Sequence, residues 1–488
     1  MTQTLPILDL GTEFFAPVAG GAFSDPVLRY RNQKQAVFLG LDKMTDNEWV
    51  QHFGNFQPLE NNLPQPLAMK YHGHQFQHYN SELGDGRGFV FAQFLKNQHL
   101  FELGTKGSGQ TPYSRRGDGR LTLKGAVREL LATDYLAKQK VLTSHTFSIV
   151  ETAEKLVRHD EPSPTRSAVL FRLSRGHIRI GNFQRALFYQ NKENIFKLMD
   201  YSLKNFYPEL PAASDQRTKT EMFFNSVSLR LADLCASYMV AGFVHGVLNT
   251  DNMNVSGESF DYGPYRFLPY YDPYFTAAYF DHEGLYSFGR QPPSFLWNLT
   301  QLREVLNFAE PTADLSHLNN TFALQFNVFF TSRFFKKLNL KPNSVSSEID
   351  LLNSFLNLSP DYYSPSEFPV LNMNLMNKAP IKEISQSLFF ANIQKIIESF
   401  FQDLYQNKSR NFETAFLQML NWTQNNLPTT YFSDETLNLI HEHTILLRQL
   451  NETQIKSREQ NLVIDEIEKI WDHIDTNDDW TWINHRLS

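Results

Sequence analysis

Near the middle of the chain the sequence reads His245-Gly246-Val247-Leu248-Asn249-Thr250-Asp251-Asn252, and Asp261-Tyr262-Gly263 begins nine residues after Asn252. Mg²⁺ prefers oxygen ligands and commonly takes one or two from the protein together with substrate phosphates. The amide of Asn252 and the carboxylate of Asp261 could supply such ligands. Taken alone, Asp251-Asn252 is equally typical of a helix cap or an Asx turn, and Asp261-Tyr262-Gly263 of a simple turn.

The spacing of these residues resembles the catalytic core of protein kinases, with one difference. Kinases place a catalytic Asp two residues after a His, an Asn five residues after that Asp, and a metal-binding Asp in a later Asp-Phe-Gly triplet. When His245 and Asn252 are aligned with this pattern, Val247 occupies the position of the base. Valine cannot accept a proton, which disfavours a conventional kinase. Asp251, one position before Asn252, is the predicted substitute.

A second group of residues lies upstream, in a region with strand and helix signals. The run 84–88, Gly-Asp-Gly-Arg-Gly, predicts a turn whose backbone amides can approach phosphate oxygens. Strands are predicted over 89–95 and 100–106, and Lys106 ends the second one. An apolar period of 3.6 residues predicts a helix over 122–139, which carries Glu129. Taken separately, the glycine run is typical of a hairpin turn, Lys106 of a solvated lysine and Glu129 of a surface carboxylate. Their order along the chain favours a lysine–glutamate pair of the kinase type.

Further strands are predicted over 145–150, 168–173 and 177–183, which completes a small mixed lobe. Two arginines, Arg172 and Arg179, fall in these strands. Their guanidinium groups suit bidentate contact with phosphate, although both are also compatible with ordinary surface positions on a strand.

The rest of the chain is predicted to be mostly helical. Thr45 and Glu48 form a capping-box signal for a helix near the N-terminus, and a long apolar helix over 220–243 leads to His245. Beyond about residue 310 only helices and loops are expected, for example over 381–406 and 433–456. We therefore predict an α+β, bilobal, protein-kinase-like fold. Its regions are an N-terminal extension (1–65), an N-lobe (66–185), a C-lobe (186–310) and a helical C-terminal region (311–488).

Composition narrows the class of protein. The chain has 488 residues, a net charge of −7 and no basic stripe, so nucleic acid is not an expected partner. No run reaches the roughly 18 apolar residues of a membrane span, and the N-terminus lacks the pattern of a signal peptide. Cys235 is the only cysteine, which excludes an internal disulfide. We expect a cytoplasmic protein that does not bind a membrane.

Several longer stretches resemble one family, selenoprotein O (SelO/YdiU), whose members are protein adenylyltransferases. The matching stretches lie between about residues 68 and 300, and they are long and unusual. They are Leu83-Gly84-Asp85-Gly86-Arg87, residues 106–115 and 117–120, Val127-Arg128-Glu129, residues 245–253, Asp261-Tyr262-Gly263-Pro264, Tyr271-Asp272-Pro273 and Gln291-Pro292-Pro293.

The resemblance implies a pseudokinase fold that binds ATP in an inverted pose and transfers AMP to Ser, Thr or Tyr hydroxyls of proteins. By motif, Asp251 would be the proton acceptor, and Asn252 and Asp261 would bind Mg²⁺, although Mn²⁺ also fits an oxygen-rich site. Glu129 would position Lys106. The residues expected at the nucleotide are Gly84, Gly86, Arg87, Lys106, Asp118, Gly119, Arg172, Arg179 and Asp261.

The chain departs from the family at its end. Many members carry a redox-active cysteine or selenocysteine near the C-terminus, whereas this sequence finishes Asn484-His485-Arg486-Leu487-Ser488. The alternatives left open by the sequence are uridylyl transfer from UTP, γ-phosphoryl transfer by a kinase that uses Asp251 as base, and a non-catalytic nucleotide-binding scaffold.

Overall fold

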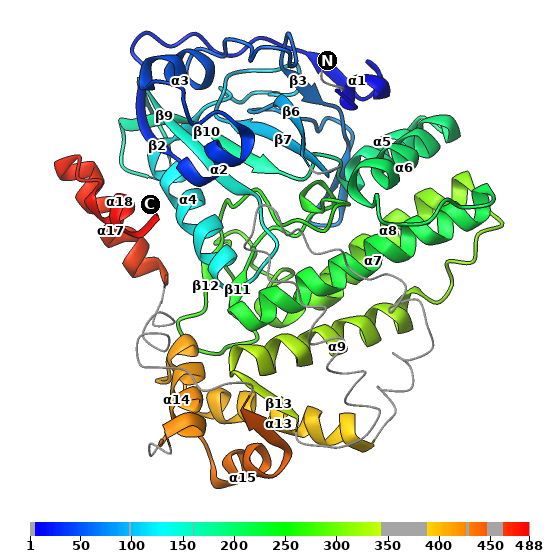
Figure 1. Cartoon of the computed structure of the whole chain (residues 1–488), viewed down its shortest axis with the longest axis vertical. Coiled ribbons are helices and arrows are strands. Elements are labelled where there is room, and N and C mark those ends of the chain that lie inside the picture. The colour runs from blue at the N-terminus through cyan, green and yellow to red at the C-terminus, as the bar shows by residue number, and fades with distance from the viewer. Residues whose placement is uncertain are drawn as a thin grey trace.

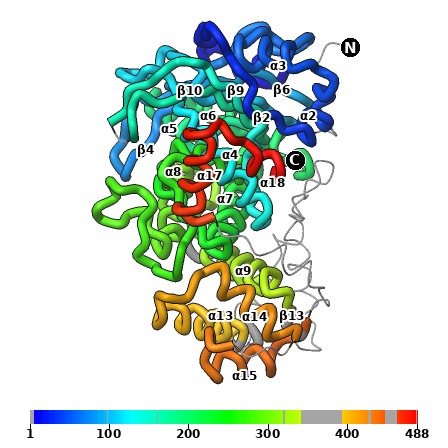
Figure 2. The backbone as a smooth tube through the Cα atoms, turned by 90° about the vertical axis from the view of Figure 1, so that its left-hand side faces the viewer, coloured from blue at the N-terminus to red at the C-terminus, as the bar shows by residue number. Residues whose placement is uncertain are grey.

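The computed structural model describes residues 5–96, 99–159, 161–342, 388–425, 429–446 and 462–487. It combines one large antiparallel sheet with many helices. The sheet lies at one end of the molecule, helices fill the middle, and a smaller helical group forms the other end (Figure 1). The last described helices return to the sheet end, where they lie against the rest of the chain (Figure 2).

Eight strands form the large sheet. Seven follow the order β1-β3-β6-β7-β10-β9-β2, β8 pairs with β10, and each pairing is antiparallel. The bounds are β1 Phe15–Pro17, β2 Val27–Arg31, β3 Leu67–Met69, β6 Val90–Lys96, β7 His99–Lys106, β8 Leu121–Thr122, β9 His145–Leu156 and β10 Thr165–Ser174. The strands predicted at 89–95, 100–106, 145–150 and 168–173 are therefore confirmed.

The N-terminal residues belong to this sheet, because β1 and β2 form its two edges. The helices α1 (Ile7–Leu10), α2 (Gln33–Leu39) and α3 (Asp46–Phe53) accompany these strands. The predicted capping box starts α3, where Thr45 and Glu48 exchange side-chain and backbone hydrogen bonds. Trp49 fixes the helix on the sheet, since its ring stacks on Phe147 at 5.0 Å and its indole N–H donates to Ser148 Oγ at 2.8 Å.

One face of the sheet is covered by α4 (Leu123–Lys138), in agreement with the helix predicted over 122–139. Helix α7 (Gln216–Ala241) contains most of the long apolar helix predicted over 220–243 and holds Cys235 in the core. The other α-helices of the described residues are α5 Ile180–Phe188, α6 Lys192–Phe206, α8 Gln291–Ala309, α9 Leu318–Lys337, α13 Leu388–Gln406, α14 Phe412–Asn425, α15 Asp434–His443, α17 Ile464–Asn477 and α18 Thr481–Leu487. None of the helices in the described ranges has both the length and the apolar character needed to cross a bilayer.

Some of the sequence predictions were wrong. Residues 177–183 do not form a strand, because α5 begins at Ile180. The alternation of Ile178 and Ile180 is typical of a strand, but Asn182 accepts the Arg179 backbone N–H at 2.8 Å, and this bond helps to start a helix. The C-terminal region also contains a two-stranded sheet of β13 (Leu340–Pro342) and β14 (Thr444–Leu446). These strands are a hundred residues apart, a pairing that local patterns do not reveal.

Parts of two predicted helices lie outside the described residues, namely 381–387 of the first and 447–456 of the second. The described remainder of the first is helical as α13. The second is helical only as far as His443, and its prediction was wrong at Thr444–Leu446, which form β14. The predicted boundaries between the four regions stay predictions.

Candidate nucleotide-binding site

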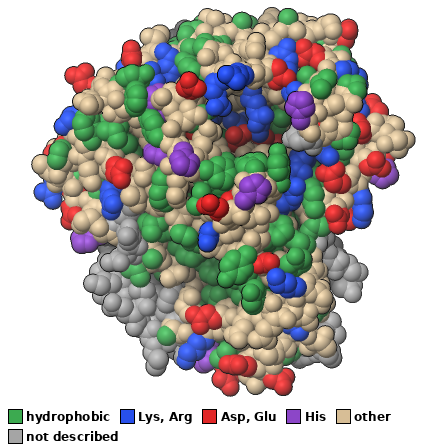
Figure 3. All heavy atoms as spheres, turned by 180° about the vertical axis from the view of Figure 1, so that it is seen from behind, with side chains coloured by type: hydrophobic (Ala, Val, Ile, Leu, Met, Phe, Trp, Pro, Cys, Tyr) green, Lys and Arg blue, Asp and Glu red, His purple; other side chains and the backbone are tan. Residues whose placement is uncertain are grey.

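A cavity of about 440 Å³ opens between loops of the sheet and the chain that follows α7. Figure 3 shows a hollow with Lys and Arg side chains on its wall and acidic side chains deeper inside. The predicted site residues that line the cavity are Gly84, Gly86, Arg87, Lys106, Asp118, Gly119, Arg172, Arg179, Asp251 and Asp261. The other two predicted residues, Glu129 and Asn252, are not among the residues that line it.

Lys106 joins the two halves of the site. It ends β7 and is 4% exposed, and its Nζ lies 2.5 Å from Glu129 Oε2 on α4. The same Nζ lies 2.7 Å from Asp261 Oδ1, which comes from the chain after α7. The lysine–glutamate pair expected from the sequence is therefore present, and Asp261 extends it to a group of three.

Arg172 and Arg179 reach the cavity from β10 and from the start of α5. Arg172 Nη1 lies 3.6 Å from Glu129 Oε1 and 3.8 Å from Asp261 Oδ1. Arg179 Nη2 lies 3.1 Å from Asp85 Oδ1. Both guanidinium groups are buried, and within the described structure Arg172 Nε and Nη1 and Arg179 Nε have no hydrogen-bond partner. Buried donors of this kind are normally satisfied, so they are suited to a bound anion.

The turn that carries Asp251 is held by its surroundings. The Nε2 of buried His245 lies 3.1 Å from the Phe260 carbonyl oxygen, which ties this turn to the segment before Asp261. Thr250 Oγ1 accepts the His74 backbone N–H at 2.7 Å. Asp251 is 8% exposed, and its Oδ1 has no hydrogen-bond partner among the described residues. Burial raises the pKa of Asp251 to about 6, since the nearby Arg179 offsets only part of the burial effect.

Asp261 has the opposite electrostatic environment. Burial alone would raise its pKa, but Lys106, Arg172 and Arg87 outweigh burial and hold the pKa of Asp261 well below its usual range. The carboxylate is 30% exposed towards the cavity. Asn252 donates its Nδ2 to the Val247 carbonyl at 2.9 Å, so its oxygen is the atom that could serve as a ligand. Asp261 is therefore ionised at neutral pH, and it lines the cavity.

Close packing explains two of the glycines in the wall. A Cβ at Gly86 would lie 2.8 Å from the Tyr113 carbonyl oxygen. Gly119 has φ +69°, and its Cβ would lie 2.2 Å from the backbone carbon of Gly109. The neighbour of Gly119 in the chain, Asp118, forms an ion pair with Arg158, and its Oδ2 lies 2.9 Å from Arg158 Nη1.

The cavity wall carries seven cationic side chains and four acidic ones. Four of these charged residues were not singled out from the sequence: Asp85, Arg115, Arg120 and Arg158. The first three lie inside the stretches that resemble the family, so the sequence contained a signal that could have identified them. Arg158 follows β9 without any motif, and only the fold brings it to the cavity. In a chain of net charge −7, this excess of positive charge is local and suits a polyanion.

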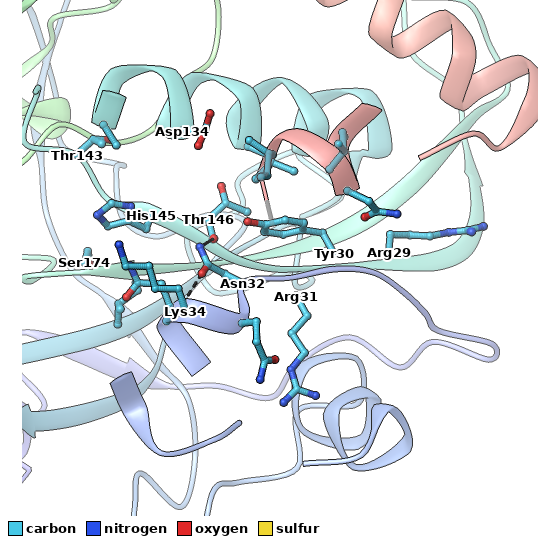
Figure 4. Close-up of a pocket in the computed structure, with 18 of the residues that line it drawn as sticks. Arg29, Tyr30, Arg31, Asn32, Lys34, Asp134, Thr143, His145, Thr146 and Ser174 are labelled. Atoms are coloured by element: carbon cyan, nitrogen blue, oxygen red, sulfur yellow. Dashed lines mark hydrogen bonds between the residues drawn. The ribbon is translucent and has the colours of Figure 1, made fainter. Parts of the chain in front are cut away.

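A second cavity, of about 500 Å³, lies beside α4 between β2, β9 and the C-terminal helix α18. Figure 4 shows Asp134 pointing down from α4 towards Tyr30, Thr146 and Asn32. None of the residues predicted for the site lines it. The geometry therefore favours the cationic cavity as the functional site.

Comparison with known proteins shows the family of the chain. The family model described as protein adenylyltransferase SelO matches residues 2–488. The protein nucleotidyltransferase YdiU of Synechocystis is 48% identical over 316 residues, which cover 64% of this chain and 65% of that protein. The YdiU proteins of Synechococcus elongatus and Hahella chejuensis are 43% and 35% identical, each over 72% of this chain and 70% of the relative. The alignments span about two thirds of the curated relatives' length. Because the family model matches almost every residue, the chain belongs to the SelO family of protein adenylyltransferases.

Proposed function

We propose that this protein is a metal-dependent adenylyltransferase with a kinase-like, bilobal pseudokinase fold. It transfers AMP from ATP to Ser, Thr or Tyr hydroxyls of other proteins and releases pyrophosphate. Family membership supports nucleotidyl transfer to protein. ATP as donor, the acceptor hydroxyl, the metal and the kinase-like fold are what the family resemblance implies, and they are part of the proposal.

One observation carries the proposal: the carboxylate of Asp251 lines a strongly cationic cavity, whereas the position that holds the base in kinases is Val247. The excess of positive charge, with unpaired donors on Arg172 and Arg179, supports binding of a triphosphate. Lys106, held between Glu129 and Asp261, is a further cation for the phosphates. Since Val247 cannot accept a proton, we assign that role to Asp251, whose buried Oδ1 has no hydrogen-bond partner among the described residues.

The reaction is an in-line displacement at the α-phosphorus. The acceptor hydroxyl oxygen forms a bond to that phosphorus, the bond to the bridging oxygen of the β-phosphate breaks, and pyrophosphate leaves with the electron pair. Asp251, whose buried Oδ1 has no partner among the described residues, receives the hydroxyl proton. Lys106 and Arg172 offset the charge that develops on pyrophosphate, which is the main contribution expected from a preorganised site.

Mg²⁺ fits the oxygen donors at the edge of the cavity, with Asp261 and the Asn252 amide oxygen as the residues that would hold it; Mn²⁺ fits as well. No three acidic, His or Cys side chains converge on one point within the described ranges. Phosphate oxygens and water would therefore complete the ligand set. When bound, the ion neutralises phosphate charge and helps to orient the α-phosphate.

The proposal is tested with ATP labelled at either the α or the γ position, incubated with the purified protein, Mg²⁺ and a bacterial lysate as acceptor, and resolved on a denaturing gel. We expect protein-bound label from the α position only, strongly reduced in Asp251→Asn and Asp261→Asn. Asp200→Asn, which removes an exposed ion pair with Lys219, is the control and should label normally. Label from the γ position would indicate a kinase, and stronger labelling from UTP a uridylyltransferase. ATP-dependent thermal stabilisation without label would indicate a scaffold.

A further inference from the structure

Two exposed aromatic side chains, Tyr279 and Phe280, and the partly buried Phe76 lie together near the Asp251 turn, and we call the three the aromatic shelf. Tyr279 is 78% exposed and Phe280 is 43% exposed. The ring centroids of Phe280 lie 5.1 Å from Tyr279 and 5.8 Å from Phe76. Contiguous exposed aromatic groups of this kind typically mark an interaction site.

The shelf is tied directly to the catalytic turn. The Phe76 backbone N–H donates to Asn249 Oδ1 at 3.0 Å, and the Tyr286 hydroxyl donates to the same oxygen at 2.8 Å. The ring of Tyr286 packs on Phe76 at 5.0 Å. Asn249 lies two residues before Asp251 in the chain, so the shelf and the proposed base share one hydrogen-bonded unit. Gln75, next to Phe76, also lines the cationic cavity.

The exposed rings stand on an ordered loop. Asp281, next to Phe280, is 6% exposed and accepts the backbone N–H groups of Leu285 and Tyr286, each at 2.8 Å. Phe76 has φ +49°, a left-handed conformation that is uncommon for an aromatic residue and is often kept at functional positions. A rigid aromatic group loses little conformational entropy when a partner covers it.

We propose that the aromatic shelf docks the acceptor polypeptide and selects segments with a large apolar residue near the modified hydroxyl. This inference rests on the proposed function. ATP would fill the cationic cavity, so the acceptor has to approach Asp251 from outside it, and the shelf continues from the cavity at that turn. The shelf rings carry no charge, so an apolar side chain of an extended segment is the matching partner. Figure 3 shows hydrophobic side chains directly below the cationic hollow.

The test uses an array of synthetic peptides, each with one Ser, Thr or Tyr and varied neighbours, incubated with α-labelled ATP and Mg²⁺. We expect labelling to favour peptides with Phe, Tyr, Leu or Met within a few residues of the hydroxyl. In the double variant Tyr279→Ser/Phe280→Ser, KM for the preferred peptide should rise about 10-fold or more, with kcat little changed. ATP-induced thermal stabilisation should stay at the wild-type level.

Tyr405→Ser is the matched control, because Tyr405 on α13 is exposed to 44%, as Phe280 is to 43%, and contacts Tyr271 rather than the shelf. It should leave KM and peptide preference unchanged. Peptide labelling without any preference for apolar neighbours, or an unchanged KM in the double variant, would overturn the shelf proposal and leave AMP transfer intact. Absence of α-label on every peptide and on the protein itself would overturn the proposed function, and the shelf proposal with it.

Discussion

Replacing Glu129 by Gln changes the site in a way that can be worked out from its geometry. Glu129 is 1% exposed and lies 2.5 Å from Lys106. Removal of one partner from a buried ion pair costs about 3–5 kcal/mol of stability, because the other charge is left buried. Lys106 keeps Asp261 at 2.7 Å. We therefore expect a loss near the lower end, about 3 kcal/mol in the free energy of unfolding.

The same substitution should slow AMP transfer. Without Glu129, Lys106 is held by Asp261 alone and competes more strongly for the carboxylate that we assign to the metal. If about 3 kcal/mol of transition-state stabilisation is lost, transfer should fall by about 10²-fold. Stability is measured by urea denaturation, and transfer by initial rates with α-labelled ATP at saturating Mg²⁺.

Glu413→Gln provides a matched control. Glu413 forms a similar pair with Lys337, 2.6 Å apart and largely buried, in the C-terminal region. This variant should lose a comparable amount of stability and keep normal transfer. Glu129 does not act by holding Lys106 if Glu129→Gln transfers AMP at the wild-type rate. The same conclusion holds if both variants lose transfer equally.

Three further outcomes are expected. Burial raises the pKa of Glu258 to about 8, so the folded protein retains a proton that the unfolded chain releases near pH 4.5. The free energy of unfolding should fall as pH rises from about 5 to 8, and urea denaturation should show a flatter profile for Glu258→Gln; equal slopes would contradict this. Gly119→Ala, which combines φ +69° with a 2.2 Å backbone clash, should weaken ATP-induced thermal stabilisation far more than Gly117→Ala, whose Cβ would meet only the Ser114 carbonyl at 3.1 Å. EDTA should abolish transfer and added Mg²⁺ should restore it, whereas transfer that persists in EDTA would contradict Asp261 as a metal ligand.

Local signals predicted much of the fold because their causes are local. The capping box at Thr45 and the apolar period around Glu129 depend on neighbours within one or two helical turns. The order of glycine turn, lysine strand and glutamate helix, which is that of protein kinases, then predicted the Lys106–Glu129 pair. This part of the site was accessible from the sequence alone.

Contacts made only by the tertiary fold could not be predicted. The ion pair of Lys106 with Asp261 joins residues 155 positions apart. Arg158 lies in the loop between the antiparallel strands β9 and β10, and only the tertiary fold brings it to Asp118. Arg179 was placed in a strand, whereas it precedes α5, and that start depends in part on Asn182. The apolar alternation there was genuine, but the side-chain hydrogen bond and packing of the helix outweighed it.

The most direct test of AMP transfer is the identity of the phosphate product. Phosphorus NMR can follow ATP during incubation with the protein, Mg²⁺ and an acceptor peptide that becomes labelled. If the protein transfers AMP, pyrophosphate should accumulate in step with peptide-bound AMP, and Asp251→Asn should suppress both together. Accumulation of ADP with phosphopeptide, and no pyrophosphate, would contradict AMP transfer.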